Sequence, residues 1–221
     1  MMNPLDIIGI GISLILAITL HEAAHGFIAY IFGDNTAKSH GRMTLNPLVH
    51  IDLFGTILLP AALLIAGAPF LFGYAKPVPV NFRRLKYERL GTACVAAAGP
   101  LMNILLALAA AALLHMNPGQ NTLGNDILVH SLRINIMFAV FNLLPILPLD
   151  GGRIFHAILP RPLQKIMEFF EPYTFFILLS LILIPMLIFQ ITGIQFEILK
   201  DILFPPFKFL LHQILMLTGQ L

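Results

Sequence analysis

Residues 15–28 read ILAITLHEAAHGFI, with two histidines and a glutamate set in an apolar run. The run covers residues 5–32, which is long enough to cross a hydrocarbon core about 30 Å thick as a helix. Four residues advance a helix by about 400°, so His21 and His25 point the same way and can share one metal ion. Glu22 lies about 100° around the helix from His21, so it is not expected to be a metal ligand but to lie near a metal-bound water. The stretch predicts a metal site inside a membrane-spanning helix.

The position of these side chains supports that interpretation. Ionisable groups at mid-span each cost several kcal/mol unless they are paired or bound to metal, so they are functional by default. The alternative is that the histidines only form hydrogen bonds with neighbouring helices, which we regard as the weaker explanation.

Composition extends the membrane interpretation to the whole chain. Of its 221 residues, 58% are hydrophobic and 11% are charged, against about 25% charged in soluble domains. We therefore predict an all-α, polytopic protein of the cell membrane, with the lipid bilayer as its surroundings. The net charge of +2 gives no indication of nucleic-acid binding, and the single cysteine, Cys94, excludes an internal disulfide.

The apolar stretches predict a single domain over residues 1–221. Firm spans are expected near residues 5–32, 87–115, 127–149 and 173–192, and an amphipathic helix, at the interface or packed on the bundle, near 202–217. A further apolar stretch, 53–73, is interrupted by Pro60, Gly67 and Pro69.

Loop charges bear on orientation. The linkers 33–51, 74–89 and 151–172 carry ten Lys and Arg residues, whereas 116–126 carries none. If 53–73 re-enters the membrane, all ten face the same side, as the positive-inside rule favours for the cytoplasm. The metal ligands then lie toward that face. A full crossing by 53–73 remains the alternative.

A catalytic zinc usually has three protein ligands, so the two histidines need a partner. Residues 142–152 read NLLPILPLDGG. Pro145 and Pro148 cannot sit in a regular helix without loss of hydrogen bonds, and Asp-Gly-Gly permits a sharp reversal with positive φ. We expect the span to unwind here inside the membrane, with Asp150 in the resulting cavity. A turn aspartate at a helix boundary is the alternative role for Asp150.

The pairing of H-E-x-x-H on an early span with Asn-x-x-Pro and Leu-Asp-Gly-Gly on a later one resembles the site-2 protease family of intramembrane metalloproteases. The stretches GRMTLNP (41–47), AKPVPVN (75–81) and AGPLMN (98–103) extend the resemblance. It is closest to the compact form, which has no PDZ or CBS domain.

The resemblance implies a three-span core and one zinc ion per chain, held by His21, His25 and Asp150. It implies that Glu22 is the catalytic acid and base and that Asn142 helps to hold an extended substrate. The implied substrates are single-span membrane proteins, whose transmembrane segments are cut near the cytoplasmic face in regulated intramembrane proteolysis.

Several alternatives stay open. An inactive homologue would bind transmembrane segments without cutting them, and a metal transporter would use the same ligands but would need polar residues along a whole path. Asn103 is expected either to bond a neighbouring helix or to line the substrate path and bind substrate. The extended residues 75–81 are a candidate for pairing with a substrate strand.

Overall fold

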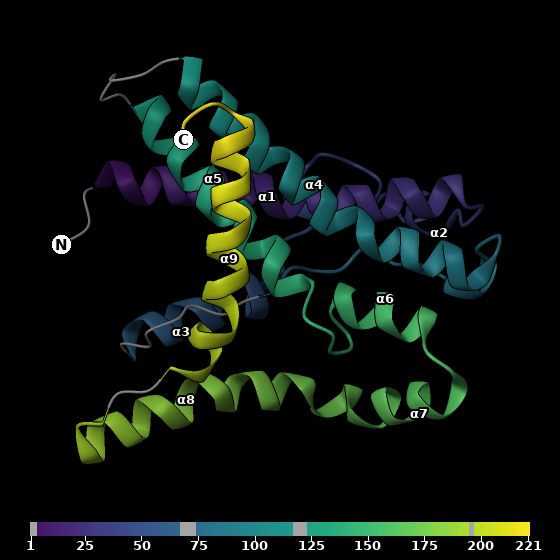
Figure 1. Cartoon of the computed structure of the whole chain (residues 1–221). Coiled ribbons are helices and arrows are strands. Elements are labelled where there is room, and N and C mark those ends of the chain that lie inside the picture. The colour runs from purple at the N-terminus through teal and green to yellow at the C-terminus, as the bar shows by residue number, and fades with distance from the viewer. Residues whose placement is uncertain (1–3, 67–73, 117–122, 195–196) are drawn as a thin grey trace.

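The computed structural model describes residues 4–66, 74–116, 123–194 and 197–221. It is 79% helical, and no strand occurs in the described residues, which confirms the all-α class. The five long helices are α1 (Pro4–Ile31), α4 (Glu88–Met116), α5 (Leu123–Asn142), α8 (Thr174–Thr192) and α9 (Ile198–Leu217). Helices α1, α4 and α5 pack together as a bundle, α9 packs on α5, and α8 contacts α9 (Figure 1). The shorter helical elements are α2 (Thr36–Ser39), η1 (Pro47–Val49), η2 (Leu53–Leu58), α3 (Leu59–Ile65), η3 (Phe82–Arg84), α6 (Asp150–Ile158), α7 (Arg161–Phe170) and η4 (Glu171–Tyr173).

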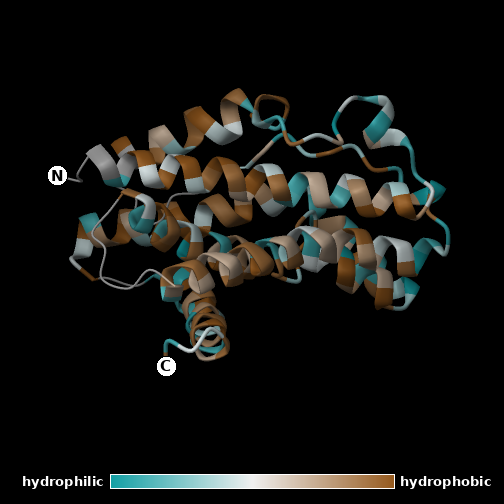
Figure 2. Ribbon diagram, turned by 90° about the horizontal axis from the view of Figure 1, so that it is seen from above, coloured by the Kyte–Doolittle hydropathy of each residue, from teal (hydrophilic) through white to brown (hydrophobic). Residues whose placement is uncertain are grey.

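Three helical segments of the described chain are long and apolar enough to cross a membrane: Ile8–Ile31, Glu88–Met116 and Arg161–Thr192. Large apolar side chains on them are exposed, as lipid contact requires; Ile191, for example, is 73% exposed. Hydrophobic residues run along the long helices in Figure 2, while hydrophilic ones gather in the loops. These are the features of a membrane protein.

Helix α5 is not among those three segments, although a span was expected near 127–149. Its first eleven residues include Asp126, His130 and Arg133, which lower its hydropathy. The helix instead packs against α1, α4 and α9. Its buried side chains Leu132, Ile136 and Val140 belong to the main hydrophobic core. Whether α5 spans the bilayer stays a prediction.

Helix α9 lies across the bundle rather than along it (Figure 1). It contacts α5, α8 and α4, and buries Leu203 and Ile214 in the same core. Near its end, the Gln220 amide donates to the Ala111 carbonyl at 2.9 Å. Of the two placements considered for this helix, packing on the bundle agrees with these contacts.

Helix α5 ends at Asn142, and residues 143–149 form turns before α6 begins at Asp150. The expected break is present, but the expected reversal at Asp-Gly-Gly is wrong. Gly151 and Gly152 are helical, and neither has positive φ. Both positions require glycine because there is no space for a side chain. A Cβ on Gly151 would lie 2.2 Å from the Leu143 carbonyl oxygen, and one on Gly152 would lie 2.3 Å from the Ile146 carbonyl carbon. The prolines break the helix, and the glycines let α6 pack against the broken segment.

The interrupted stretch 53–73 begins with η2 and α3, and its residues 67–73 lie outside the described part of the chain. Its first turn is tied to the segment that follows, because Tyr74 N–H donates to the Gly55 carbonyl at 3.0 Å. Gly55 is required there, since a Cβ would lie 2.4 Å from the Tyr74 ring. Whether the stretch re-enters or crosses the membrane stays a prediction.

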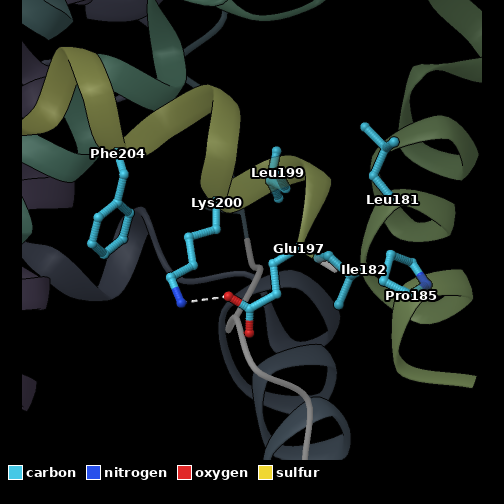
Figure 3. A pocket seen from close by; sticks show the side chains of 7 residues that line it. All are labelled: Leu181, Ile182, Pro185, Glu197, Leu199, Lys200 and Phe204. Atoms are coloured by element: carbon cyan, nitrogen blue, oxygen red, sulfur yellow. Dashed lines mark ion pairs between the residues drawn. The ribbon is translucent and has the colours of Figure 1, made fainter. Parts of the chain in front are cut away.

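A cavity of about 250 Å³ lies between α8 and α9 (Figure 3). Its lining is apolar except for Glu197 and Lys200, which form an ion pair at 2.5 Å. None of the predicted metal ligands lines it.

Candidate metal centre

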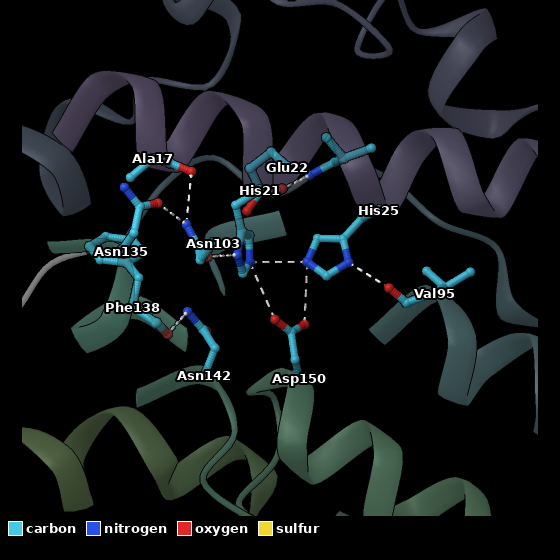
Figure 4. Close-up of polar contacts among 11 residues, drawn as sticks. Ala17, His21, Glu22, His25, Val95, Asn103, Asn135, Phe138, Asn142 and Asp150 are labelled. Carbon is cyan, nitrogen blue, oxygen red and sulfur yellow. Dashed lines mark hydrogen bonds and ion pairs between the residues drawn. The ribbon is translucent and has the colours of Figure 1, made fainter. Parts of the chain in front are cut away.

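Three potential ligand atoms converge where α1 meets the start of α6 (Figure 4). His21 and His25 lie one helical turn apart on α1, and their Nε2 atoms are 3.0 Å apart. Asp150, the first residue of α6, directs Oδ2 to His21 Nε2 at 3.2 Å and Oδ1 to His25 Nε2 at 3.4 Å. The helix spacing and the break after α5 together produce the cluster.

The donor set and its geometry fit zinc. Bonds of about 2.0–2.2 Å in a tetrahedron place neighbouring donor atoms about 3.3 Å apart, close to the distances between these atoms. Asp150 Oδ2 is buried and accepts no hydrogen bond from the residues that the structure describes. A buried carboxylate oxygen without a hydrogen bond is costly, and a metal ion between the three side chains would remove that cost.

Both histidines are held in the protonation form that binds metal through Nε2. His21 Nδ1 lies 2.6 Å from Asn103 Oδ1, and His25 Nδ1 lies 2.7 Å from the Val95 carbonyl oxygen. Both partners are acceptors, so each neutral ring carries its proton on Nδ1 and its lone pair on Nε2. The two Nε2 atoms therefore face Asp150 ready to coordinate.

Helix α4 makes room for these rings at Gly99. A Cβ there would lie 2.5 Å from His21 Cε1 and 2.5 Å from His25 Nε2. Gly99 and Pro100 are buried in the middle of α4. The Gly-Pro pair in the stretch 98–103 thus lies against the candidate metal site.

Glu22 directs one carboxylate oxygen to the segment 74–81. Its Oε2 accepts a hydrogen bond from the Val78 backbone N–H at 2.8 Å. It is not part of the metal-binding cluster. A carboxylate beside the cluster, outside the set of ligand atoms, has the placement of a general base.

The segment that carries Val78 is anchored on either side. Lys76 N–H donates to the His50 carbonyl at 2.9 Å, and Asn81 N–H donates to Asp34 Oδ2 at 2.7 Å. Burial opposes ionisation of Asp34, but hydrogen bonds from Thr36 and Asn81, with the nearby Arg84 charge, outweigh it and lower the pKa of Asp34.

Of the two predicted substrate-binding amides, Asn103 is fully buried and Asn142 is half-buried. Asn103 bonds to His21, and its Nδ2 donates to Asn135 Oδ1 at 2.8 Å, which agrees with a role between helices. Asn142 Nδ2 donates to the Phe138 carbonyl at 3.1 Å. In Figure 4 Asn142 lies on the same side of the histidines as Asp150.

Sequence reasoning missed Asn135, Val95 and Val78. Asn135 left a signal, because a buried amide in an apolar helix needs a partner. Val95 and Val78 act through backbone groups, and no side chain in the sequence marks such a role.

Fold and site together define a helical membrane protein with a candidate zinc centre of protease type. The family model of peptidase family M50 matches residues 124–185. The "Putative zinc metalloprotease YwhC" of Bacillus subtilis is 40% identical over 186 residues, which cover 79% of this chain and 80% of that protein. The "Putative zinc metalloprotease Rip2" of Mycolicibacterium smegmatis is 27% identical over 191 residues, which cover 84% of this chain and 72% of that protein. No solved structure matches the chain.

The chain belongs to peptidase family M50, the site-2 protease family. It is a metalloprotease whose cofactor is zinc.

Proposed function

We propose that this metalloprotease cleaves the transmembrane segments of single-span membrane proteins, near the cytoplasmic face of the cell membrane. The observation that carries the proposal is the position of the candidate ligands. His21 and His25 lie within Ile8–Ile31, a helix apolar enough to span the bilayer, and past its midpoint. A peptide bond cut there would itself lie in the bilayer.

Basic residues support the orientation. Lys86 N–H donates to the Phe32 carbonyl at 2.8 Å, which ties a basic loop to the end of α1. The Arg153 guanidinium on α6 lies 4.8 Å from the centre of the Phe82 ring in the same loop. Lys and Arg near helix ends favour the cytoplasmic side. The proposed topology is multi-pass, with the zinc site toward that side.

In the proposed mechanism, His21, His25 and Asp150 would hold one zinc ion. When bound, zinc supplies Lewis-acid chemistry, polarising the scissile carbonyl and lowering the pKa of a water molecule toward about 7. The Glu22 carboxylate takes a proton from the attacking water and later passes it to the leaving amine. Asn142, which is half-buried at the end of α5, holds the extended substrate.

The substrate has to unwind before it reaches Glu22. Carbonyl groups in a helix are occupied by internal hydrogen bonds, so helix-weakening residues near the cytoplasmic end would favour cleavage. Residues 75–81 form no regular structure and pass over Glu22 through Val78. An extended substrate pairing with this segment would bring its backbone to the base.

Co-expression with a library of single-span membrane proteins tests the proposal. We expect the wild-type enzyme to cut substrates with helix-weakening residues near the cytoplasmic end, and Glu22→Gln to cut at least about a hundredfold more slowly with zinc still bound. Gln keeps the size and the acceptor oxygen for Val78 but lacks a basic carboxylate. Equal cleavage by Glu22→Gln would exclude Glu22 as the base, and failure of the wild-type enzyme to cut any single-span protein of the library would contradict the membrane substrate class.

A further inference from the structure

A continuous series of hydrogen bonds between buried polar side chains runs from His21 on α1 through Asn103 to Asn135 on α5, and it ends at the Ser131 backbone carbonyl. His21 Nδ1 meets Asn103 Oδ1 on α4 at 2.6 Å, and Asn103 Nδ2 donates to Asn135 Oδ1 at 2.8 Å. Asn135 Nδ2 in turn donates to the Ser131 carbonyl at 2.8 Å. Asn103 and Asn135 are 0% and 1% exposed. Three helices are thus linked to one candidate zinc ligand (Figure 4).

The Ser131 end of this hydrogen-bond series determines which group donates and which accepts at each step. The Ser131 carbonyl can only accept, so the NH₂ group of Asn135 faces it and the Asn135 oxygen faces Asn103. The NH₂ group of Asn103 therefore turns to Asn135 and also lies 3.4 Å from the Ala17 carbonyl. Its oxygen is left for His21, which must donate from Nδ1. Each amide fixes the orientation of the next, back to the ring.

The protonation form of His25 does not depend on the orientation of an amide side chain. Its Nδ1 bonds directly to the Val95 backbone carbonyl, a group that cannot exchange donor for acceptor. An amide such as Asn103 can turn over. With its NH₂ group toward His21, it would favour the ring form that carries the proton on Nε2 and cannot coordinate through that atom.

We propose that Asn135 is a positioning residue for zinc, acting through Asn103 to hold His21 with its Nε2 lone pair toward the metal. This inference rests on the proposed assignment of His21 as a ligand. Partners that orient a ligating histidine typically change metal affinity by about 10–100-fold when removed. Asn135 would do so from α5, a helix that supplies no ligand.

The first test measures zinc affinity of purified protein in detergent by chelator competition. Asn135→Leu keeps the approximate size of the side chain and removes the acceptor for Asn103, so we expect about 10–100-fold weaker binding. Ser13→Ala is the matched control. Ser13 is also fully buried, and its hydroxyl joins α1 to α5 by donating to the Ile127 carbonyl at 3.0 Å. It should lower thermal stability without changing zinc affinity.

A second pair of variants tests the direction of this hydrogen-bond series. In Asn103→Asp both carboxylate oxygens accept, so either orientation serves His21 and Asn135 is no longer needed to choose between them. Adding Asn135→Leu to Asn103→Asp should therefore cause no further loss of zinc affinity. Should Asn135→Leu fail to fold, Asn135→Asp is the second variant: burial favours the neutral acid, which keeps an acceptor for Asn103 and an O–H donor for the Ser131 carbonyl, and it should bind zinc within about threefold of wild type.

The outcomes separate this inference from the ligand assignment. Wild-type affinity in Asn135→Leu, an equal loss in Ser13→Ala, a loss in Asn135→Asp, or a further loss when Asn135→Leu is added to Asn103→Asp would each overturn the positioning role. Unchanged zinc binding in His21→Ala would instead overturn the ligand assignment on which the inference rests.

Discussion

The Val78 backbone N–H donates to Glu22 Oε2 at 2.8 Å, so the proposed base is held by a segment 56 residues away in the sequence. Val78 lies between Pro77 and Pro79, which have no N–H to donate. Its Cγ1 also lies 3.2 Å from the place where a Cβ on Gly26 would stand. The carboxylate is thereby oriented by a single main-chain donor.

Removing that donor should slow cleavage. Val78→Pro deletes the N–H, so Glu22 loses its fixed orientation, and we expect a decrease on the order of tenfold to a hundredfold with zinc content unchanged. Val80→Pro is the control, because it also follows a proline and its N–H forms no hydrogen bond among the described residues. Equal cleavage by Val78→Pro and wild type, measured with purified enzyme in detergent, would remove Val78 from the site.

The metal content of variants tests the third ligand. Asp150→Ala should lose most of its zinc, because two histidines alone leave the site one protein ligand short. Asp201→Ala, an exposed carboxylate on α9, should retain about one zinc ion per chain. Metal analysis of the two purified proteins decides the point. Undiminished zinc in Asp150→Ala would mean that Asp150 is not a ligand.

A methyl group on Gly99 should disrupt the centre. In Gly99→Ala the Cβ would lie 2.5 Å from both histidine rings, so α4 or α1 must shift. We expect loss of zinc and a lower melting temperature in detergent. Gly11→Ala places its Cβ on α1 with nothing within 4 Å, and should stabilise the helix by about 0.5–1 kcal/mol. Full zinc binding by Gly99→Ala would contradict the close packing.

Asp34 predicts a pH-dependent contribution to stability. Its pKa is lowered, with burial outweighed by the hydrogen bonds from Thr36 and Asn81. A carboxylate whose pKa is lower in the folded state stabilises the fold above its unfolded pKa of about 3.9, and the effect is lost as pH falls through the folded pKa. Melting temperatures of wild type and Asp34→Asn should differ most near pH 7 and converge below about pH 4. A difference that grows toward low pH would show the opposite sign.

The sequence predicted that His21, His25 and Asp150 come together because the parts of this cluster obey local rules. His21 and His25 are four residues apart on a helix, and Pro145 and Pro148 force a break just before Asp150. The place of the break was predictable, but the conformation after it was not. Asp-Gly-Gly is compatible with a reversal and with a helix start, and only the packing of α6 against Leu143 and Ile146 selects the helix.

The contacts that hold His21 and Glu22 could not be predicted from the sequence, for a different reason. Asn103 was recognisable as a buried amide, but its partners lie on α1 and α5, and their alignment depends on how the helices pack. The Val78 contact was harder to predict from the sequence, because any residue except proline has a backbone N–H. Helix α5 shows the limit of hydropathy, since its polar first half lowers its apolar character although it packs in the centre of the bundle.

The anchors on either side of Val78 impose a length constraint on uncovering the base. Lys76 and Asn81 are fixed to His50 and Asp34, and only residues 77–80 lie between them. The two prolines hold their own φ near −65° and favour extended conformations in the residues before them. Four residues in an extended conformation cannot move away from Glu22 while the hydrogen bonds of Lys76 and Asn81 are both formed. Exposure of the Glu22 carboxylate therefore requires that one of these two hydrogen bonds breaks.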